Sequence, residues 1–166
     1  NELSYPIHFK EIRLTQDMTG AGRNRGAPGA RITYGPSNHP MTVVFAADAQ
    51  VNPARGVRGG RDGNVGEMHI LDAQGNKKRA PSVGEIELKK GTWLSGLETS
   101  GGGYGSPLHR DPDRVLDDVM ERYISQSYAE DVYGVVLSGQ IDDETLALDM
   151  TATQARRAQL SAAGSE

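Results

Sequence analysis

Apolar and polar positions alternate over short stretches of the first hundred residues, which is the period-two pattern of β-strands. The first stretch runs from Ile7 to Leu14 and slips once near Glu11, so a β-bulge is expected there. Other stretches are rich in β-branched or aromatic residues, which favour strands. These predicted strands are residues 31–34, 41–46, 68–71 and 84–88, with a turn at 72–75 after the third.

The apolar spacing becomes helical after a glycine run at 101–105. Asp111 and Pro112 suit a helix start, because Asp caps free N–H groups and Pro fits the first turn. The apolar residues of this predicted helix share one face, and they are Val115, Leu116, Val119 and Tyr123.

Three further elements are expected towards the C-terminus. A second short helix begins after Ser125, a usable N-cap, and residues 133–137 favour one more strand. The last helix begins near Ala152, where residues 151–154 match a capping box. A face of small residues on this helix suits docking on another surface, and it consists of Ala155, Ala158 and Ala162.

These elements predict an α+β fold in a single domain over residues 1–166. A β-rich, glycine-loop-rich body occupies about 1–100, and 101–166 form a glycine loop and a helical tail with one further short strand. The hydrophobic share is 36%, with 21 glycines and 8 prolines. Because globular domains usually hold about 45–50% apolar residues, we expect a thin core that leans on a neighbouring domain or subunit.

Charge and cysteine content exclude several classes of protein. The chain has 18 basic and 22 acidic residues and a net charge of -4, without the basic excess of a nucleic-acid binder. The lack of cysteine excludes disulfides and thiolate metal sites. No apolar run approaches the ~20 residues of a membrane helix, and no signal peptide is recognised. We therefore expect a cytoplasmic protein without nucleic-acid or membrane partners.

Residues with catalytic chemistry are sparse. The histidines are scattered, with no pair at the i, i+4 spacing of a helical zinc site; they are His8, His39, His69 and His109. Neither a Gly-x-Ser-x-Gly elbow nor a Walker-type phosphate loop occurs. The sequence therefore predicts no metal site in this chain alone and leaves the catalytic residues unknown.

The remaining candidates lie in two glycine loops. Arg23 and Arg25 are two positions apart in loop 20–29, where their forked donors can reach carboxylates. They either pin the loop to the sheet or to a partner subunit, or they recognise an anion. The run 101–105 likewise serves close backbone packing or a ligand. The candidate substrate or interface residues are Arg23, Arg25, Gly102, Gly103, Tyr104, His109, Arg110 and Asp111.

Two motifs carry a family resemblance. Residues 17–29 read Asp-Met-Thr-Gly-Ala-Gly-Arg-Asn-Arg-Gly-Ala-Pro-Gly, and residues 101–112 read Gly-Gly-Gly-Tyr-Gly-Ser-Pro-Leu-His-Arg-Asp-Pro. In this order and spacing they resemble the C-terminal part of the hydantoinase B/oxoprolinase family. The chain departs from the family pattern at Met18, Thr19, Ala27 and Ser106.

The resemblance implies ATP-dependent opening of a cyclic amide such as 5-oxoproline or a hydantoin. It implies that ATP with Mg and a divalent metal bind elsewhere in a hetero-oligomeric complex. The implied partners are the remainder of a B-type subunit and an ATP-binding A-type subunit. Three functions stay open: a C-terminal chain or fragment of such a B-type subunit, a structural subunit of a related ATP-dependent ketone carboxylase, and a non-catalytic binding domain.

Overall fold

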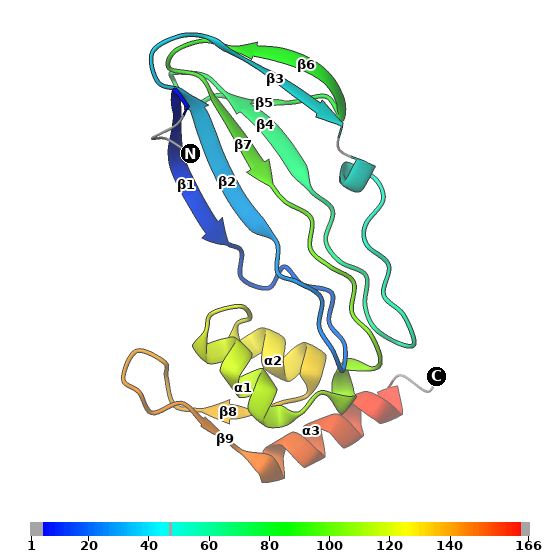
Figure 1. Ribbon diagram of the computed structural model, residues 1–166. Coiled ribbons are helices and arrows are strands. Elements are labelled where there is room, and N and C mark those ends of the chain that lie inside the picture. The colour runs from blue at the N-terminus through cyan, green and yellow to red at the C-terminus, as the bar shows by residue number, and fades with distance from the viewer. Residues whose placement is uncertain (1–4, 47, 164–166) are drawn as a thin grey trace.

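The computed structural model describes residues 5–46 and 48–163 (Figure 1). Strands fill the first part of the chain and helices the last, which confirms the predicted α+β class. The strands of the first part are β1 (Ile7–Leu14), β2 (Ala30–Pro36), β3 (Met41–Ala46), β4 (Glu67–Leu71), β5 (Lys77–Arg79), β6 (Val83–Leu88) and β7 (Trp93–Leu97). The later elements are α1 (Pro112–Met120), α2 (Gln126–Tyr133), β8 (Leu137–Ser138), β9 (Ala147–Leu148) and α3 (Met150–Ala163). Short 3-10 helices lie at η1 (Asp48–Gln50) and η2 (Pro107–His109).

An antiparallel five-stranded sheet with the order β1-β2-β7-β4-β5 forms the body of the molecule. The register of β1 against β2 shifts between Phe9 and Glu11, which confirms the predicted bulge. The predicted turn after β4 also forms, with the Gly75 amide donating to the Asp72 carbonyl at 3.0 Å. Sequence reasoning missed β5 and β7, although β7 is the central strand. In β7, Ser95 and Gly96 interrupt the run of strand-forming side chains that marks the other strands.

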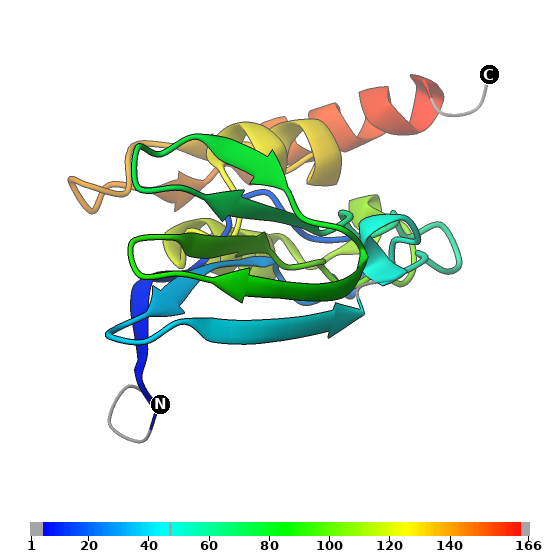
Figure 2. The same ribbon diagram turned by 90° about the horizontal axis from the view of Figure 1, so that it is seen from above.

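A two-stranded antiparallel sheet of β3 and β6 packs over one face of this sheet (Figure 2). Leu88 of β6 and Leu94 of β7 are each only 1% exposed and lie at the centre of this apolar cluster. Side chains of the strands around them complete the cluster, namely Tyr34, Met41, Val43, Phe45, Met68, Ile70, Ala80 and Ile86. The result is a thin two-layer sandwich.

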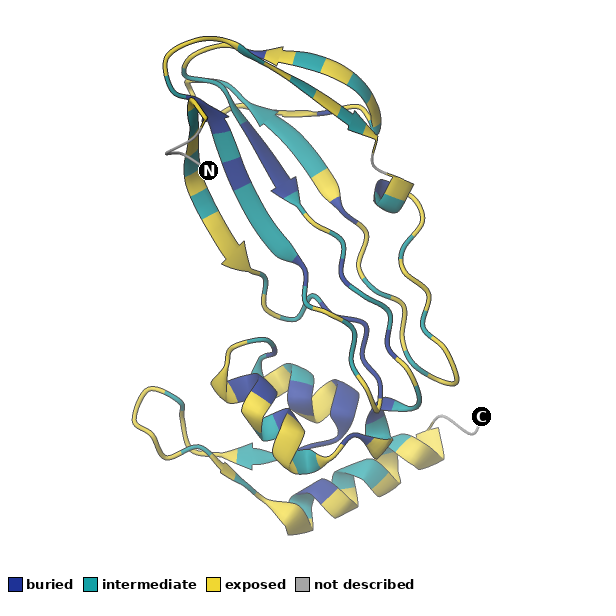
Figure 3. Cartoon of the chain, viewed as in Figure 1, coloured by how far each residue is buried: buried dark blue, intermediate teal, exposed yellow. Residues whose placement is uncertain are grey.

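The helices build a second apolar cluster, separate from the first (Figure 3). The predicted N-caps are confirmed, because Asp111 accepts from the Asp113 amide and Ser125 accepts from the Tyr128 amide. The buried members of this cluster are Ala21, Val115, Val119, Ile124, Ala129, Val132, Tyr133 and Val135. Among the described residues, no helix combines the length and apolar character needed to cross a membrane.

Three local predictions in this part are wrong. Residues 133–137 form no continuous strand, because Tyr133 ends α2 and Gly134 adopts the left-handed conformation of a helix C-cap. Tyr123 lies beyond the end of α1. The last helix begins at Met150, where Asp149 accepts from the Ala152 amide, so the predicted capping box at 151–154 does not start it.

Candidate functional site at the glycine loops

Three glycine-rich loops run side by side between the sheet and the helices (Figure 1). We call segments 20–29, 52–66 and 99–105 the glycine-loop layer. Its backbone hydrogen bonds join all three segments: the Gly20 amide donates to the Gly101 carbonyl at 2.9 Å, and the Gly103 amide donates to the Arg61 carbonyl at 2.9 Å. The Arg61 amide in turn donates to the Ala21 carbonyl at 2.7 Å. Backbone hydrogen bonds therefore hold the three loops against one another, outside the strands of the sheet.

Close backbone approach explains the glycines of this layer. A Cβ atom on Gly102 would lie 2.2 Å from the Arg55 carbonyl oxygen, and one on Gly103 would lie 2.0 Å from the Ala21 carbonyl oxygen. No side chain fits at such distances. Of the two interpretations of the run 101–105, the geometry favours close packing over ligand contact.

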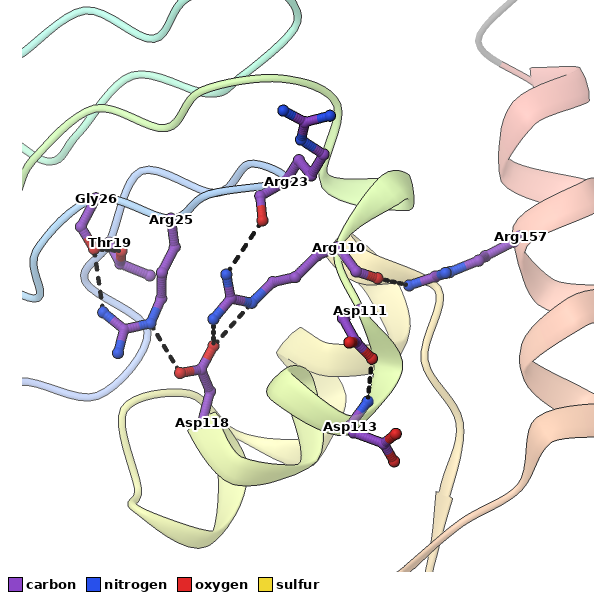
Figure 4. Close-up of polar contacts among 9 residues, drawn as sticks. All are labelled: Thr19, Arg23, Arg25, Gly26, Arg110, Asp111, Asp113, Asp118 and Arg157. Carbon is purple, nitrogen blue, oxygen red and sulfur yellow. Dashed lines mark hydrogen bonds and ion pairs between the residues drawn. The ribbon is translucent and has the colours of Figure 1, made fainter.

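An ion-pair cluster joins this layer to the helices (Figure 4). Arg25 Nε donates to Asp118 Oδ1 at 2.8 Å, and the Arg110 guanidinium reaches Asp118 Oδ2 with Nη2 at 2.8 Å and Nε at 3.1 Å. Asp118 projects from α1, whereas Arg25 comes from loop 20–29 and Arg110 from the residue after η2. We call Arg25, Arg110 and Asp118 the arginine cluster.

Backbone carbonyls accept further hydrogen bonds from the same guanidinium groups. Arg110 Nη1 donates to the Arg23 carbonyl at 3.2 Å, and Arg25 Nη1 donates to the Gly26 carbonyl at 3.2 Å. From α3, Arg157 Nη2 donates to the Arg110 carbonyl at 2.6 Å. The cluster therefore ties the glycine loop, α1 and α3 together (Figure 4).

Burial sets the electrostatics of this region. Asp118 is 4% exposed and Arg110 7%, so neither charge is stable there without its partner. The Arg25 guanidinium also lies 4.7 Å from the centre of the Tyr123 ring, a cation–π contact. Burial raises the pKa of the nearby Tyr133 phenol to about 12, and burial lowers the pKa of Arg157 from its usual value.

The structure brings together only some of the predicted site residues. The Arg23 side chain is exposed and points away from Asp118, so only its carbonyl takes part (Figure 4). Tyr104 is 38% exposed, with the Arg58 guanidinium 5.7 Å from its ring centre. His109 is exposed at the end of η2, and Asp111 serves as the cap of α1.

Asp118 and Arg157 are the residues that sequence reasoning left out of the candidate set. Asp118 lies three positions after Val115, on the buried face of the helix that the apolar spacing predicts. A carboxylate on such a face needs a cationic partner. The helical spacing therefore indicates that Asp118 is a buried carboxylate, whereas nothing local in the sequence distinguishes Arg157 from the exposed arginines.

The arrangement holds loops and helices in place. The donors of the arginine cluster go to a carboxylate and to carbonyls within the chain. Across the described ranges, no three His, Cys, Asp or Glu side chains come together in a group able to hold a metal ion.

Comparison with known proteins agrees with the motif resemblance. The family model described as hydantoinase B/oxoprolinase matches residues 1–107. The chain belongs to this family. The hydantoinase B match covers the sheet and the whole glycine-loop layer, and it ends before α1.

Relatives of the hydantoinase B chain extend the likeness through the helices. This chain is 32% identical to the beta subunit of a caprolactamase from Pseudomonas jessenii, over 95% of this chain and 27% of the relative. It is 30% identical to the B component of a putative D-/L-hydantoinase from Pseudomonas sp. (strain NS671), over 86% of this chain and 25% of the relative. The acetone carboxylase alpha subunit of Xanthobacter autotrophicus (strain ATCC BAA-1158 / Py2) is 23% identical over 96% of this chain and 25% of the relative. The chain thus spans about a quarter of the length of these relatives.

Two solved structures have a similar fold. The crystal structure of the ATP-dependent caprolactamase from Pseudomonas jessenii matches 95% of this chain and 27% of that chain, with a TM-score of 0.69 and 25% identity. The nucleotide-free structure of an acetone carboxylase matches 96% of this chain and 25% of that chain, with a TM-score of 0.70 and 21% identity. The second match is a likeness of fold alone.

Proposed function

We propose that this chain is the C-terminal part of a B-type subunit that contributes to ATP-dependent hydrolysis of a cyclic amide within a larger complex. The family match and the likeness to components of a caprolactamase and a hydantoinase support this assignment. Caprolactam, hydantoins and 5-oxoproline are the corresponding substrate candidates, all of them cyclic amides. A cytoplasmic location is part of the proposal, because such a reaction consumes ATP.

The arginine cluster is the observation that supports a non-catalytic role for the chain within that complex. Arg25 and Arg110 come from the two family motifs, yet both direct their donors to Asp118 and to carbonyls of the chain. Groups whose donors are directed to acceptors of the same chain hold a shape and do not act on a substrate. The chain therefore supplies a rigid part of the subunit.

Partners and cofactors follow from the same proposal. The remainder of the B-type subunit and an ATP-binding A-type subunit complete the hetero-oligomer, and ATP with Mg and a divalent metal bind outside this chain. The caprolactamase and hydantoinase relatives are each one component of an enzyme with several chains, which supports such an assembly.

A structural part of an ATP-dependent ketone carboxylase is the second candidate. The acetone carboxylase alpha subunit covers 96% of this chain at 23% identity, which favours this candidate over an unrelated binding domain. The two enzymes differ in co-substrate, because a carboxylase requires bicarbonate or carbon dioxide and a hydrolase requires only water.

The test is an assay of ATP turnover in the reconstituted complex. We expect the chain alone to release no phosphate with any cyclic amide. Joined to the remainder of its subunit and to the A-type subunit, it should support ATP hydrolysis that depends on caprolactam, a hydantoin or 5-oxoproline. Turnover that requires acetone and bicarbonate would establish the carboxylase instead. Turnover by the pure chain would refute both.

A further inference from the structure

The five-stranded sheet has a second face, opposite the two-stranded β3–β6 sheet. Tyr34 and Leu94 point into the apolar cluster between the two sheets, so their strand neighbours Thr33 and Ser95 point to the other side. The helices lie beyond the ends of the strands and not across this face (Figure 1). An open depression of about 540 Å³ occupies it. Its lining residues are Lys10, Glu11, Arg13, Arg31, Thr33, Leu71, Lys77 and Ser95.

The charge of this depression is unbalanced. Its lining has four cationic side chains and one carboxylate. Arg13 and Arg31 lie directly opposite each other on β1 and β2, a like-charge pair that destabilises a sheet. Glu11 pairs with Arg13 at 2.5 Å. Within the described part of the chain, Arg31 and Lys77 form no ion pair.

The floor between these charges is well ordered and partly apolar. Thr33 and Ser95 are 3% and 7% exposed, and their hydroxyl groups hydrogen-bond at 3.0 Å. Leu71 lies opposite Trp93 in the register of β4 and β7, on the same face. Lys10 lies 5.3 Å from the centre of the Trp93 ring. Aromatic residues and arginine, which this face combines, are enriched at protein interfaces.

We propose that this face, from Arg13 on β1 to Lys77 on β5, is a docking surface for an acidic polypeptide segment of a partner protein. The excess cations need carboxylates opposite them, and the planar guanidinium fork of Arg31 matches a carboxylate. Four strand spacings separate β1 from β5 in the sheet, which is roughly 19 Å at the usual strand separation. A small anion cannot span that distance, whereas an extended polypeptide can.

Two other polyanions fit the face less well. A nucleic acid presents regularly spaced phosphates over a long surface, and the net charge of -4 on the chain would oppose its approach. A free phosphate needs a compact cradle of donors, which a broad open face does not provide. The docking surface concerns assembly and does not depend on the identity of the cyclic amide.

The test is a titration of the purified chain with poly-L-glutamate of about 20 residues, at about 20 mM and about 200 mM salt. Trp93 is the single tryptophan, so its fluorescence reports directly on this face. We expect binding at low salt, a weaker response at high salt, and, with the ligand, a higher melting temperature of the sheet as followed by Trp93 fluorescence. Arg31→Glu and Lys77→Glu should each weaken binding at least about tenfold.

Matched variants keep the result interpretable. Arg114→Glu reverses an equally exposed charge on α1, away from the sheet, and should bind as the unaltered chain does. Lys77 is exposed on an edge strand, so its variant is expected to fold even if Arg31→Glu does not. The inference fails if poly-L-glutamate does not bind, or if Lys77→Glu and Arg114→Glu weaken binding equally. It also fails if inorganic phosphate or duplex DNA binds the face more tightly, since the occupant is then a phosphate group. A dimer in sedimentation that Lys77→Glu abolishes would likewise contradict it, since the occupant is then a second copy of the chain.

Discussion

At the scale of single residues, Arg25 tests whether the arginine cluster holds the glycine-loop layer. Lysine keeps the charge but loses the fork that reaches both Asp118 and the Gly26 carbonyl. It also loses the planar group that stacks on Tyr123. We predict that Arg25→Lys lowers the free energy of unfolding by about 1–3 kcal/mol, measured by urea denaturation.

Arg23 is the matched control for this prediction. It belongs to the same loop, but its side chain is exposed and only its carbonyl accepts a hydrogen bond. Arg23→Lys should therefore change the free energy of unfolding by less than about 0.5 kcal/mol. Equal losses in the two variants would contradict the role assigned to Arg25.

At Tyr133 we predict that a substitution leaves the free energy of unfolding unchanged or raises it. Its hydroxyl group is buried and, among the described residues, has no hydrogen-bond partner. Removing a buried hydroxyl without a partner removes an uncompensated desolvation cost. We predict that Tyr133→Phe is neutral or up to about 1 kcal/mol more stable at pH 7. The neighbouring Tyr128 hydroxyl donates to the Thr19 carbonyl at 3.3 Å, so Tyr128→Phe should instead cost about 0.5–1.5 kcal/mol.

Alkaline pH separates the Tyr133 variant further. Burial raises the pKa of Tyr133 from 10.0 to about 12, so the unfolded chain loses this proton first as the pH rises. The stability linked to this phenol is complete below pH 10 and is lost between pH 10 and about 12. Tyr133→Phe should therefore lose less stability than the unaltered chain over that interval. An identical alkaline loss in both proteins would exclude this cause.

The residue scale also shows what the sequence leaves undetermined. Arg25 and Arg110 were identified because glycine motifs surround them, and Asp111 because it precedes a proline. Their common target could not be predicted, since Arg25 and Asp118 are 93 positions apart and meet only through the fold. Arg25 binds a carboxylate of the chain, whereas the Arg23 side chain forms no ion pair within the described residues.

At the scale of elements, the N-cap of α1 yields the next prediction. Asp111 accepts from the Asp113 amide at 3.1 Å, which satisfies one of the free donors at the helix start. We predict that Asp111→Ala costs about 0.5–2 kcal/mol in urea denaturation. Ser106 precedes η2 in the equivalent position without a side-chain cap bond, so Ser106→Ala should leave stability unchanged within about 0.5 kcal/mol. No difference between the two variants would mean that the cap of α1 is redundant.

Element boundaries were predictable where local chemistry determines them. The bulge in β1 and the starts of α1 and α2 depend on side chains a few positions apart. The central strand β7 depends instead on β2 and β4, which surround it in the sheet, and its own composition is too mixed to mark it. Residues 133–137 mislead in the other direction, because Tyr133 ends α2 and only Leu137 pairs with another strand, while Val135 is buried in the helical cluster.

At the scale of the whole molecule, the two apolar clusters are small and separate. A glycine-loop layer, held by backbone hydrogen bonds, lies between them and contributes few apolar side chains. A compact monomer of 17.8 kDa exposes about 8,000 Å², whereas this chain exposes 9852 Å². Val44 and Val83, on the outer side of the two-stranded β3–β6 sheet, are 74% and 71% exposed. This excess surface fits a chain that is completed by neighbouring protein.

We therefore predict that the isolated chain does not behave as a self-sufficient domain. Without a partner surface, the sheet cluster and the helical cluster should lose structure separately, because few apolar contacts couple them. Size-exclusion chromatography with light scattering should show association, driven by exposed apolar groups such as Val44 and Val83. Urea denaturation followed by Trp93 fluorescence, which reports on the sheet, should not coincide with far-UV circular dichroism, which is dominated by the helices. Adding the remainder of the subunit should merge the two transitions into one at a higher urea concentration. A monomer whose two transitions already coincide would show that hydrogen bonds through the glycine-loop layer are sufficient to make the chain one cooperative unit.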